Sequence, residues 1–255
     1  MRSFVSIVLC VSAGCIAWAQ ETAPSSAPTT AEPKSVAEAR AIIEKAREAL
    51  KQIKTIRYQM KFQAHGWMAK YAADTEGSVL LGELSELNIP RFRCEIRITP
   101  ADSKSAIELQ ASSDGEIYYV IDPKTRIVHA DIDEAVLGSQ SQDVLRVPFR
   151  EFVIKEPLAN ELRAKQIEWK GEVKVGDVAC HQIEVTMTET RRSTWFIAKQ
   201  DWLPRRLVRV VTDATLGEGY MEYELQNLQP ETTFDPKQFK LTVPAGYRKT
   251  DDFAP

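Results

Sequence analysis

Histidine and cysteine are the side chains best suited to catalysis or metal binding, and this chain has few of either. The three histidines, His65, His129 and His181, lie far apart, and no segment has the spacing of an HExxH helix, a GxSxG turn, a phosphate-binding loop or a cysteine-rich metal site. Cys180 and His181 are neighbours, but adjacent side chains on a strand point to opposite faces, so they do not form a nucleophile and base pair. The sequence therefore predicts no catalytic residue, no metal site and no cofactor.

The amino-terminal segment is expected to direct the protein out of the cytoplasm. Arg2 precedes an apolar run, 4–18, which ends in the small-residue pattern Ala-Trp-Ala at Ala19. This predicts a signal peptide over 1–19, cleaved after Ala19, and the run is shorter than the roughly 20 residues that a spanning helix needs. Cys15 follows Ala-Gly, as in a lipoprotein box, but Ser12 stands where Leu or Val is usual, so lipid anchoring at Cys15 is the less supported alternative.

The cysteines that remain after cleavage are Cys94 and Cys180. Disulfides persist in exported proteins, and a bridge here would close a long loop, which contributes about 4 to 5 kcal/mol in the chain-entropy model. Two separate buried thiols are the alternative, because the sequence does not tell whether the two Cα atoms lie within reach. Both alternatives stay open at this point.

Composition argues against a nucleic-acid partner and separates a linker from a folded domain. The formal net charge is −3, which gives no electrostatic footprint for nucleic acid, and 44% of the residues are hydrophobic, enough for a sizeable core. Residues 20–34 contain three prolines and many small polar residues, which predicts a disordered linker. The folded domain is expected over 35–255.

The domain opens with a helical pattern and continues with strands. Ser35 and Glu38 form a capping box, and the apolar residues that follow predict an amphipathic helix over 36–53, with shorter helices at 133–137 and 149–163. Between and after these helices the apolar period is two. The alternating runs are Tyr58, Met60 and Phe62; Phe92, Cys94, Ile96 and Ile98; Ile107, Leu109 and Ala111; Ile167 and Trp169; Ile183, Val185 and Met187; Met221, Tyr223 and Leu225.

This pattern predicts a mainly β, α+β domain. About ten consecutive strands without helical crossovers favour an antiparallel meander, and an open sheet that wide must curl or split. We expect a single wide sheet curled into an unclosed half-barrel, with the amino-terminal helix and the short helices covering its concave face. A sandwich of two sheets is the alternative.

Several short segments, in this order, resemble the periplasmic lipoprotein carriers of the LolA/LolB-like superfamily. They are Phe62-Gln63, Pro90-Arg91-Phe92-Arg93, Ser113-Asp114-Gly115 with Tyr118, Tyr119, Asp122 and Pro123, and Phe239 to Tyr247. Two further stretches, Val178 to Ile183 and Leu203-Pro204-Arg205-Arg206, are similar to a related group of predicted periplasmic proteins.

The resemblance implies a half-barrel whose apolar interior accepts the acyl chains of a lipidated protein or a lipid during transit across the envelope. It also implies a membrane-bound donor or acceptor protein as a partner. Arg93 matches an arginine that holds the helical lid shut, whereas its place in the strand alternation favours a solvated strand arginine. A monomer is expected.

An acyl chain carried through water needs a dry surface, because each exposed methylene costs about 0.8 kcal/mol. Aromatic and methionine side chains suit such a surface, since they present large apolar areas and methionine adapts its packing. Ordinary core packing is the alternative for each of them. The residues expected to line the cavity are Met60, Phe62, Phe92, Ile96, Tyr119, Trp169, Met187, Trp195 and Met221.

We therefore expect an exported binding protein, not an enzyme, that shields an acyl chain or another amphiphile. The alternative is an envelope sensor or scaffold, in which a lipid-binding sheet regulates a protein partner. No nucleic-acid partner is expected.

Overall fold

The computed structural model describes residues 34–251, apart from 101–104 and 140. The expected signal peptide and nearly all of the expected linker lie outside the described residues. The chain from Pro33 onward forms one compact unit, and the description that follows concerns this unit.

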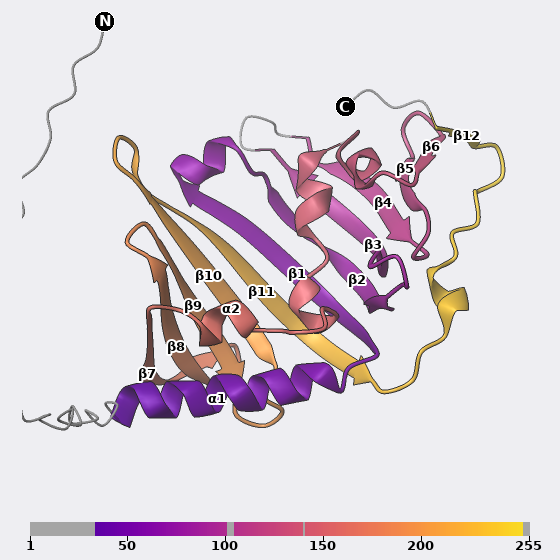
Figure 1. The fold of residues 1–255 in the computed structure, drawn as a ribbon. Helices are drawn as coiled ribbons and strands as arrows, with labels where there is room; N and C mark the ends of the chain where they lie inside the picture. The colour runs from indigo at the N-terminus through magenta and orange to yellow at the C-terminus, as the bar shows by residue number, and fades with distance from the viewer. Residues whose placement is uncertain (1–33, 101–104, 140, 252–255) are drawn as a thin grey trace, which may run out of the picture. The chain divides into compact units, whose positions relative to one another are not determined.

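The unit is built on one sheet of twelve strands (Figure 1). The strands are β1 (Thr55–Gly66), β2 (Asp74–Leu84), β3 (Pro90–Thr99), β4 (Ile107–Ser113), β5 (Tyr118–Asp122), β6 (Ile127–Asp131), β7 (Gln166–Val175), β8 (Val178–Thr188), β9 (Arg191–Ala198), β10 (Pro204–Asp213), β11 (Gly217–Glu231) and β12 (Arg248–Thr250). Their order across the sheet is β12-β6-β5-β4-β3-β2-β1-β11-β10-β9-β8-β7.

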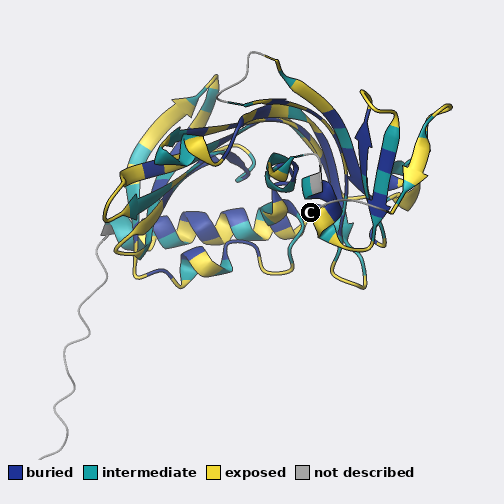
Figure 2. Ribbon diagram, turned by 90° about the horizontal axis from the view of Figure 1, so that it is seen from above, coloured by how far each residue is buried: buried dark blue, intermediate teal, exposed yellow. Residues whose placement is uncertain are grey.

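This order consists of two meanders that are joined in the middle of the sheet. Strands β1 to β6 run outward from the centre, and β7 to β11 run from the opposite edge back to it, so that β1 pairs with β11. All neighbouring strands are antiparallel except β12 and β6, which are parallel. The sheet arches without closing (Figure 2), which confirms the predicted half-barrel and excludes the sandwich.

Strand alternation decides which side chains line the inside of the arch. In β1, Tyr58, Met60 and Phe62 are buried while Gln59 and Lys61 are exposed, because successive side chains point to opposite faces. The registers of the neighbouring strands extend this pattern into rows. One row on the inner face consists of Phe62, Tyr223, Leu207, Trp195, Ile183 and Trp169.

Helix α1 (Lys34–Lys51) lies inside the arch and packs against β7 (Figure 2). Its apolar stripe includes Ala39, Ile43 and Leu50, all at most 2% exposed. The spacing of these residues puts them on one face, so the helix covers the sheet with its apolar side. No helix among the described residues has the length and apolar character needed to cross a bilayer.

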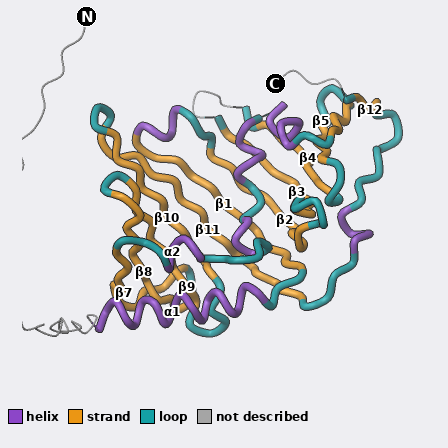
Figure 3. The backbone as a smooth tube through the Cα atoms, viewed as in Figure 1, coloured by secondary structure: helices purple, strands orange, loops and turns teal. Residues whose placement is uncertain are grey.

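A second cover follows β6 and consists of short helical turns (Figure 3). They are η2 (Glu134–Ser139), η3 (Gln142–Arg146), η4 (Arg150–Phe152) and α2 (Ala159–Leu162). The helix predicted over 149–163 is therefore wrong. Pro157 disfavours helical backbone before it, and Leu158 takes a left-handed conformation with φ 58°, so the helix is broken into two turns.

The carboxyl-terminal segment passes over the outer face of the sheet before β12 pairs with β6. Phe239 of η5 (Pro236–Phe239) is fully buried there, and a Cβ at Gly82 of β2 would lie 2.5 Å from its ring. The guanidinium of Arg91 lies 5.1 Å from the centre of the Phe234 ring. Glycine at position 82 thus lets this segment lie close to β2.

Candidate functional site on the concave face

Eight of the nine residues expected to line a cavity lie on the concave face of the sheet. Met60, Phe62, Phe92, Ile96 and Trp195 are at most 4% exposed. Trp169, Met187 and Met221 are half-buried and pack against the same core. The strands thus bring these side chains onto one apolar surface.

The expectation for Tyr119 is wrong, because it lies on the outer face. It pairs with Ser112 and Ala130, and the ammonium of Lys249 lies 5.6 Å from the centre of its ring. Its neighbour Tyr118 belongs to the core instead. Two adjacent tyrosines fit either phase of the alternation, and this ambiguity misled the assignment.

The concave face is covered by two phenylalanines from the helical segment after β6, Phe149 and Phe152, which we call the plug. Both are at most 5% exposed. The Phe149 ring centre lies 6.1 Å from that of Trp195 and 6.0 Å from that of Tyr223, and the Phe152 ring centre lies 5.4 Å from that of Tyr58. Sequence reasoning missed the plug, since its residues carry no period that links them to a strand.

Tyr58 anchors the plug by hydrogen bonds. Its hydroxyl accepts a hydrogen bond of 2.9 Å from the Phe149 N–H and donates one of 3.5 Å to the Val147 carbonyl. Burial raises the pKa of the Tyr58 phenol above its ordinary value, so the phenol keeps its proton. One side chain of β1 thereby binds the backbone N–H of Phe149 in the plug and the carbonyl of Val147, two residues before it.

Helix α1 is tied to the same segment by two of its own arginines. Arg40 Nη1 donates a hydrogen bond of 2.9 Å to the Leu162 carbonyl, and Arg47 forms an ion pair with Glu156. The lid contact predicted for Arg93 is wrong. Arg93 is exposed on the outer face of β3, between the inward-facing Phe92 and Cys94, so it cannot reach the helices.

Two carboxyl groups are enclosed in the helical segment. Glu161 is 9% exposed, and Glu151 Oε2 accepts a hydrogen bond of 3.1 Å from the Leu158 N–H. Burial raises the pKa of both carboxyl groups; for Glu151 the Leu158 N–H and the charge of Arg209 counteract this, while the Glu161 charge adds to it. The protonated forms therefore persist to higher pH than in an exposed glutamate.

The two cysteines do not form a disulfide, so that alternative is wrong. Both are free thiols; Cys94 faces the main core from β3, and Cys180 faces a small cluster with Phe196 and Ala198 on the other side of β8. Five strands at about 4.8 Å spacing lie between β3 and β8. Burial raises the pKa of the Cys94 thiol to about 12.

The three histidines remain apart. His181 stacks on Trp202 with a ring-centre distance of 5.6 Å, and Lys45 Nζ of α1 lies 4.5 Å from the centre of the same indole. His65 stacks instead on Tyr220, at 4.3 Å. Burial lowers the pKa of His181. Within the described residues, no three His, Cys, Asp or Glu side chains are grouped closely enough to hold a metal ion.

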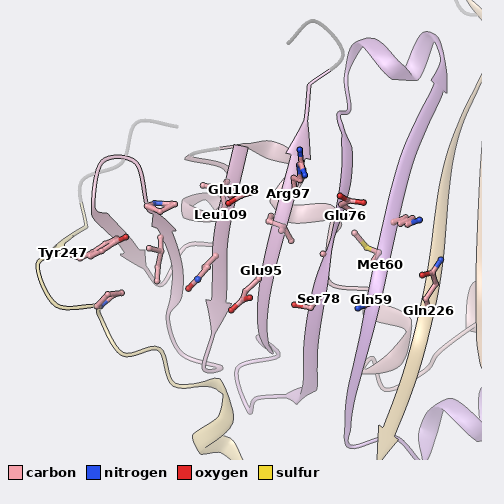
Figure 4. A pocket seen from close by; sticks show the side chains of 17 residues that line it. Gln59, Met60, Glu76, Ser78, Glu95, Arg97, Glu108, Leu109, Gln226 and Tyr247 are labelled. Carbon is pink, nitrogen blue, oxygen red and sulfur yellow. The ribbon is translucent and has the colours of Figure 1, made fainter. Parts of the chain in front are cut away.

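Two hollows, of about 580 and 710 Å³, lie over the outer face of the sheet. The side chains that line the first come largely from the exposed positions of β1 to β4, among them Gln59, Glu76, Ser78, Glu95 and Arg97 (Figure 4). Amide and charged groups suit polar ligands and not hydrocarbon. The apolar concave face is therefore the better candidate site for an acyl chain.

The chain is similar to several solved structures at low sequence identity. The lipoprotein LppX of Mycobacterium tuberculosis is 12% identical with a TM-score of 0.47, covering 78% of this chain and 99% of its own. MucB of Pseudomonas aeruginosa, solved with MucA, is 10% identical with a TM-score of 0.45, covering 80% of this chain and 61% of its own. A LolA superfamily protein from Nitrosomonas europaea is 10% identical with a TM-score of 0.32, covering 80% of this chain and 97% of its own.

No curated protein matches the chain. A family model does, over residues 92–251, and this range contains both stretches, Val178 to Ile183 and Leu203 to Arg206, whose similarity to predicted periplasmic proteins was noted from the sequence. This agreement confirms that resemblance. Because the match covers more than half of the chain, the protein belongs to the family described as predicted periplasmic protein (DUF2092).

Proposed function

We propose that this protein is an exported binding protein that shields an acyl chain, or another amphiphile, between the concave face of its sheet and the helical cover. One observation carries the proposal. The inner row from Phe62 to Trp169 is apolar across six strands, and it is covered by separate helical segments instead of a second sheet. Such a cover can move while the sheet stays intact.

The energetics favour this kind of site. A chain of sixteen carbons exposed to water costs on the order of 12 kcal/mol, at about 0.8 kcal/mol for each methylene. Contact with the inner row would remove most of that cost. Release is also required of a carrier, which argues for a cover whose displacement costs only a few kcal/mol.

The plug defines how the ligand would enter. Phe149 and Phe152 lie against Trp195, Tyr223 and Tyr58, so the acyl chain takes their place when the helical segment moves outward. The polar bonds that oppose that movement come from the Tyr58 hydroxyl, from Arg40 and from the exposed Arg47 ion pair. Two further hydrogen bonds join Asp143 and Arg146 of η3 to the backbone of Ala73 and Tyr71. The acyl chain then covers the apolar surface that the plug uncovers as it moves.

Transfer between membranes is the cellular role that fits such a site. The family is described as periplasmic, and cleavage after Ala19 would release the protein into that compartment. A lipidated protein or a lipid would be the cargo, with a membrane-bound protein as its donor or acceptor. The intact mass of the exported protein distinguishes an amino terminus at Gln20 from a lipid-modified Cys15.

A brominated acyl chain tests the proposal, because bromine quenches tryptophan fluorescence only at short range. Titration with a brominated fatty alcohol should quench the wild-type protein, and Trp195→Phe should remove most of that quenching. Trp67→Phe is the matched control, because Trp67 lies outside the concave face in η1 (Trp67–Lys70), where its indole N–H donates to the Gly217 carbonyl. Equal loss in both variants, or no quenching at all, would overturn the proposal.

A further inference from the structure

Arg209 of β10 places a positive charge on the apolar concave face. It pairs across the sheet with Met221 of β11 and Ser193 of β9. Its guanidinium carbon lies 6.0 Å from the centre of the Tyr223 ring, which belongs to the core and contacts the plug. The side chain is exposed, and it forms no ion pair or hydrogen bond with any described residue.

Three polar groups without a hydrogen-bond partner among the described residues lie on the same face of the sheet. The Ser193 hydroxyl makes no hydrogen bond within the described part of the chain, although the residue is 7% exposed. Trp195 lies two residues further along the same face of β9 and is fully buried. Among the described residues, neither its Nε1 nor the buried Nε1 of Trp169, in the same row as Trp195, has a hydrogen-bond partner. Buried donors are nearly always paired in native proteins, so an acceptor from a ligand would account for them.

Burial increases from Arg209 and Met221 toward the adjacent row, and this gives the ligand a direction. Arg209 is exposed, and Met221 beside it is half-buried, whereas Tyr223 and Phe62 in the adjacent row are at most 8% exposed. A ligand with its charged end at Arg209 would therefore have its apolar end in the dry part of the face. This is the orientation that an amphiphile requires.

The nearby carboxyl groups form no ion pair with the arginine. Glu151 and Glu161 both interact electrostatically with the charge of Arg209, yet neither is ion-paired with it. Burial raises the pKa of both carboxyl groups, so each becomes neutral at a higher pH than an exposed glutamate does. The guanidinium therefore has no carboxylate partner among the described residues and can bind another anion.

We propose that Arg209, with the Ser193 hydroxyl and the indole N–H of Trp195, binds the anionic head group of the amphiphile whose acyl chain lies along the concave face. The inference rests on the proposed function and specifies its ligand class, an amphiphile that carries a carboxylate or a phosphate. Guanidinium groups bind both anions through paired, charge-assisted hydrogen bonds. An uncharged alcohol of the same chain length would offer no negative charge to the guanidinium and at most one oxygen to the three donors.

Competition between ligands of equal chain length tests the inference. A pyrene-labelled fatty alcohol serves as the bound probe, and it is displaced with laurate, dodecyl phosphate or dodecanol. On the wild-type protein, the better of the two anions should displace the probe at a concentration at least about ten-fold below that of dodecanol. Comparison of laurate with dodecyl phosphate distinguishes a carboxylate site from a phosphate site.

In Arg209→Gln, the anion and dodecanol should displace the probe at nearly equal concentrations. The concentration of dodecanol that displaces the probe should be the same as for the wild type. Arg192→Gln is the matched control, because Arg192 lies one strand away on the outer face, paired with Val210 and ion-paired with Glu218; its preference for the anion should match the wild type. The inference is overturned if anions and dodecanol displace the probe from the wild type equally well, or if Arg209→Gln keeps the wild-type preference for the anion. Either result leaves the proposed function standing. Displacement by none of the three ligands overturns both.

Discussion

At the scale of single residues, the buried hydroxyl of Tyr58 stabilises the packing of the helical segment on the sheet. Its oxygen accepts from the Phe149 N–H and donates to the Val147 carbonyl. Tyr58→Phe leaves both backbone groups buried without that partner, which should lower the free energy of unfolding by about 1 to 3 kcal/mol. Urea denaturation measures the change, with Tyr220→Phe, at an exposed tyrosine, as the control. A similarly small decrease in the free energy of unfolding in both variants would contradict the assigned role.

Glu151 gives the molecule a predictable pH dependence. Burial raises its pKa in the folded state above the unfolded value, so the folded protein binds more protons between these two values. The stability contributed by this group is present in full below the unfolded pKa and is lost as the pH rises through the folded pKa. Glu151→Gln removes the cost of ionisation and keeps an oxygen that can accept from the Leu158 N–H.

We therefore expect Glu151→Gln to be more stable than the wild type at neutral pH and equally stable below about pH 4. Thermal denaturation at a series of pH values measures the difference. Glu86→Gln, at an exposed position, controls for the loss of one negative charge. A constant difference at all pH values would show that ionisation of Glu151 is not its cause.

Residue types with a clear strand phase could be placed from the sequence, and others could not. Phe62 and Phe92 lie on the concave face as expected, because each belongs to a run in which polar neighbours fix the phase. Trp195 also faces inward, although Phe196, Ile197 and Ala198 follow it without a polar residue. Tyr119 was misplaced, since the apolar run around it fits both phases. Arg209 was missed because a charge within an apolar strand is normally read as a solvent-facing residue.

At the scale of elements, α1 is a cover that depends on its apolar stripe. Ile43 is fully buried, and Ile43→Ala should reduce the free energy of unfolding by about 2 to 5 kcal/mol, through lost transfer energy and the cavity that remains. Chemical denaturation tests this, with Ala41→Ser on the exposed side of the helix as the control. Loss of less than about 1 kcal/mol would mean that α1 contributes little to the packed core.

Helix α1 was predictable from its period, although it begins at Lys34, one residue before the expected cap Ser35. For the second cover the sequence indicated helical segments but not their conformation. The segment from η2 to α2 has short turns and a left-handed Leu158, so its conformation follows from tertiary contacts more than from local preference. The plug belongs to this segment. Sequence alone therefore revealed the surface that is covered but not the side chains that cover it.

At the scale of the whole molecule, the carboxyl-terminal segment packs on the outer face of the sheet and stabilises it. Phe239 is fully buried against β2 at Gly82. Phe239→Ala should lower the free energy of unfolding by about 3 to 5 kcal/mol, while Leu87→Ala, at a residue that is 68% exposed, should change it little. Equal effects in a urea titration would contradict a bracing role for this segment.

The overall architecture was predictable because it depends on many alternating positions that agree with one another. The parallel pairing of β12 with β6 was not, since a strand of three residues carries almost no periodic pattern. The separation of Cys94 from Cys180 also depends on the strand order, which the spacing of cysteines does not encode.

The pairing of β1 with β11 has a consequence for how the protein is made. During synthesis the amino-terminal strands emerge first, and the inner edge of that half stays unpaired until the last long strand has emerged. The two halves then pair in the middle of the sheet, through contacts between residues far apart in the chain, a topology that slows folding. A chaperone that binds exposed strand edges would thus have most to protect in the interval before β11 is available.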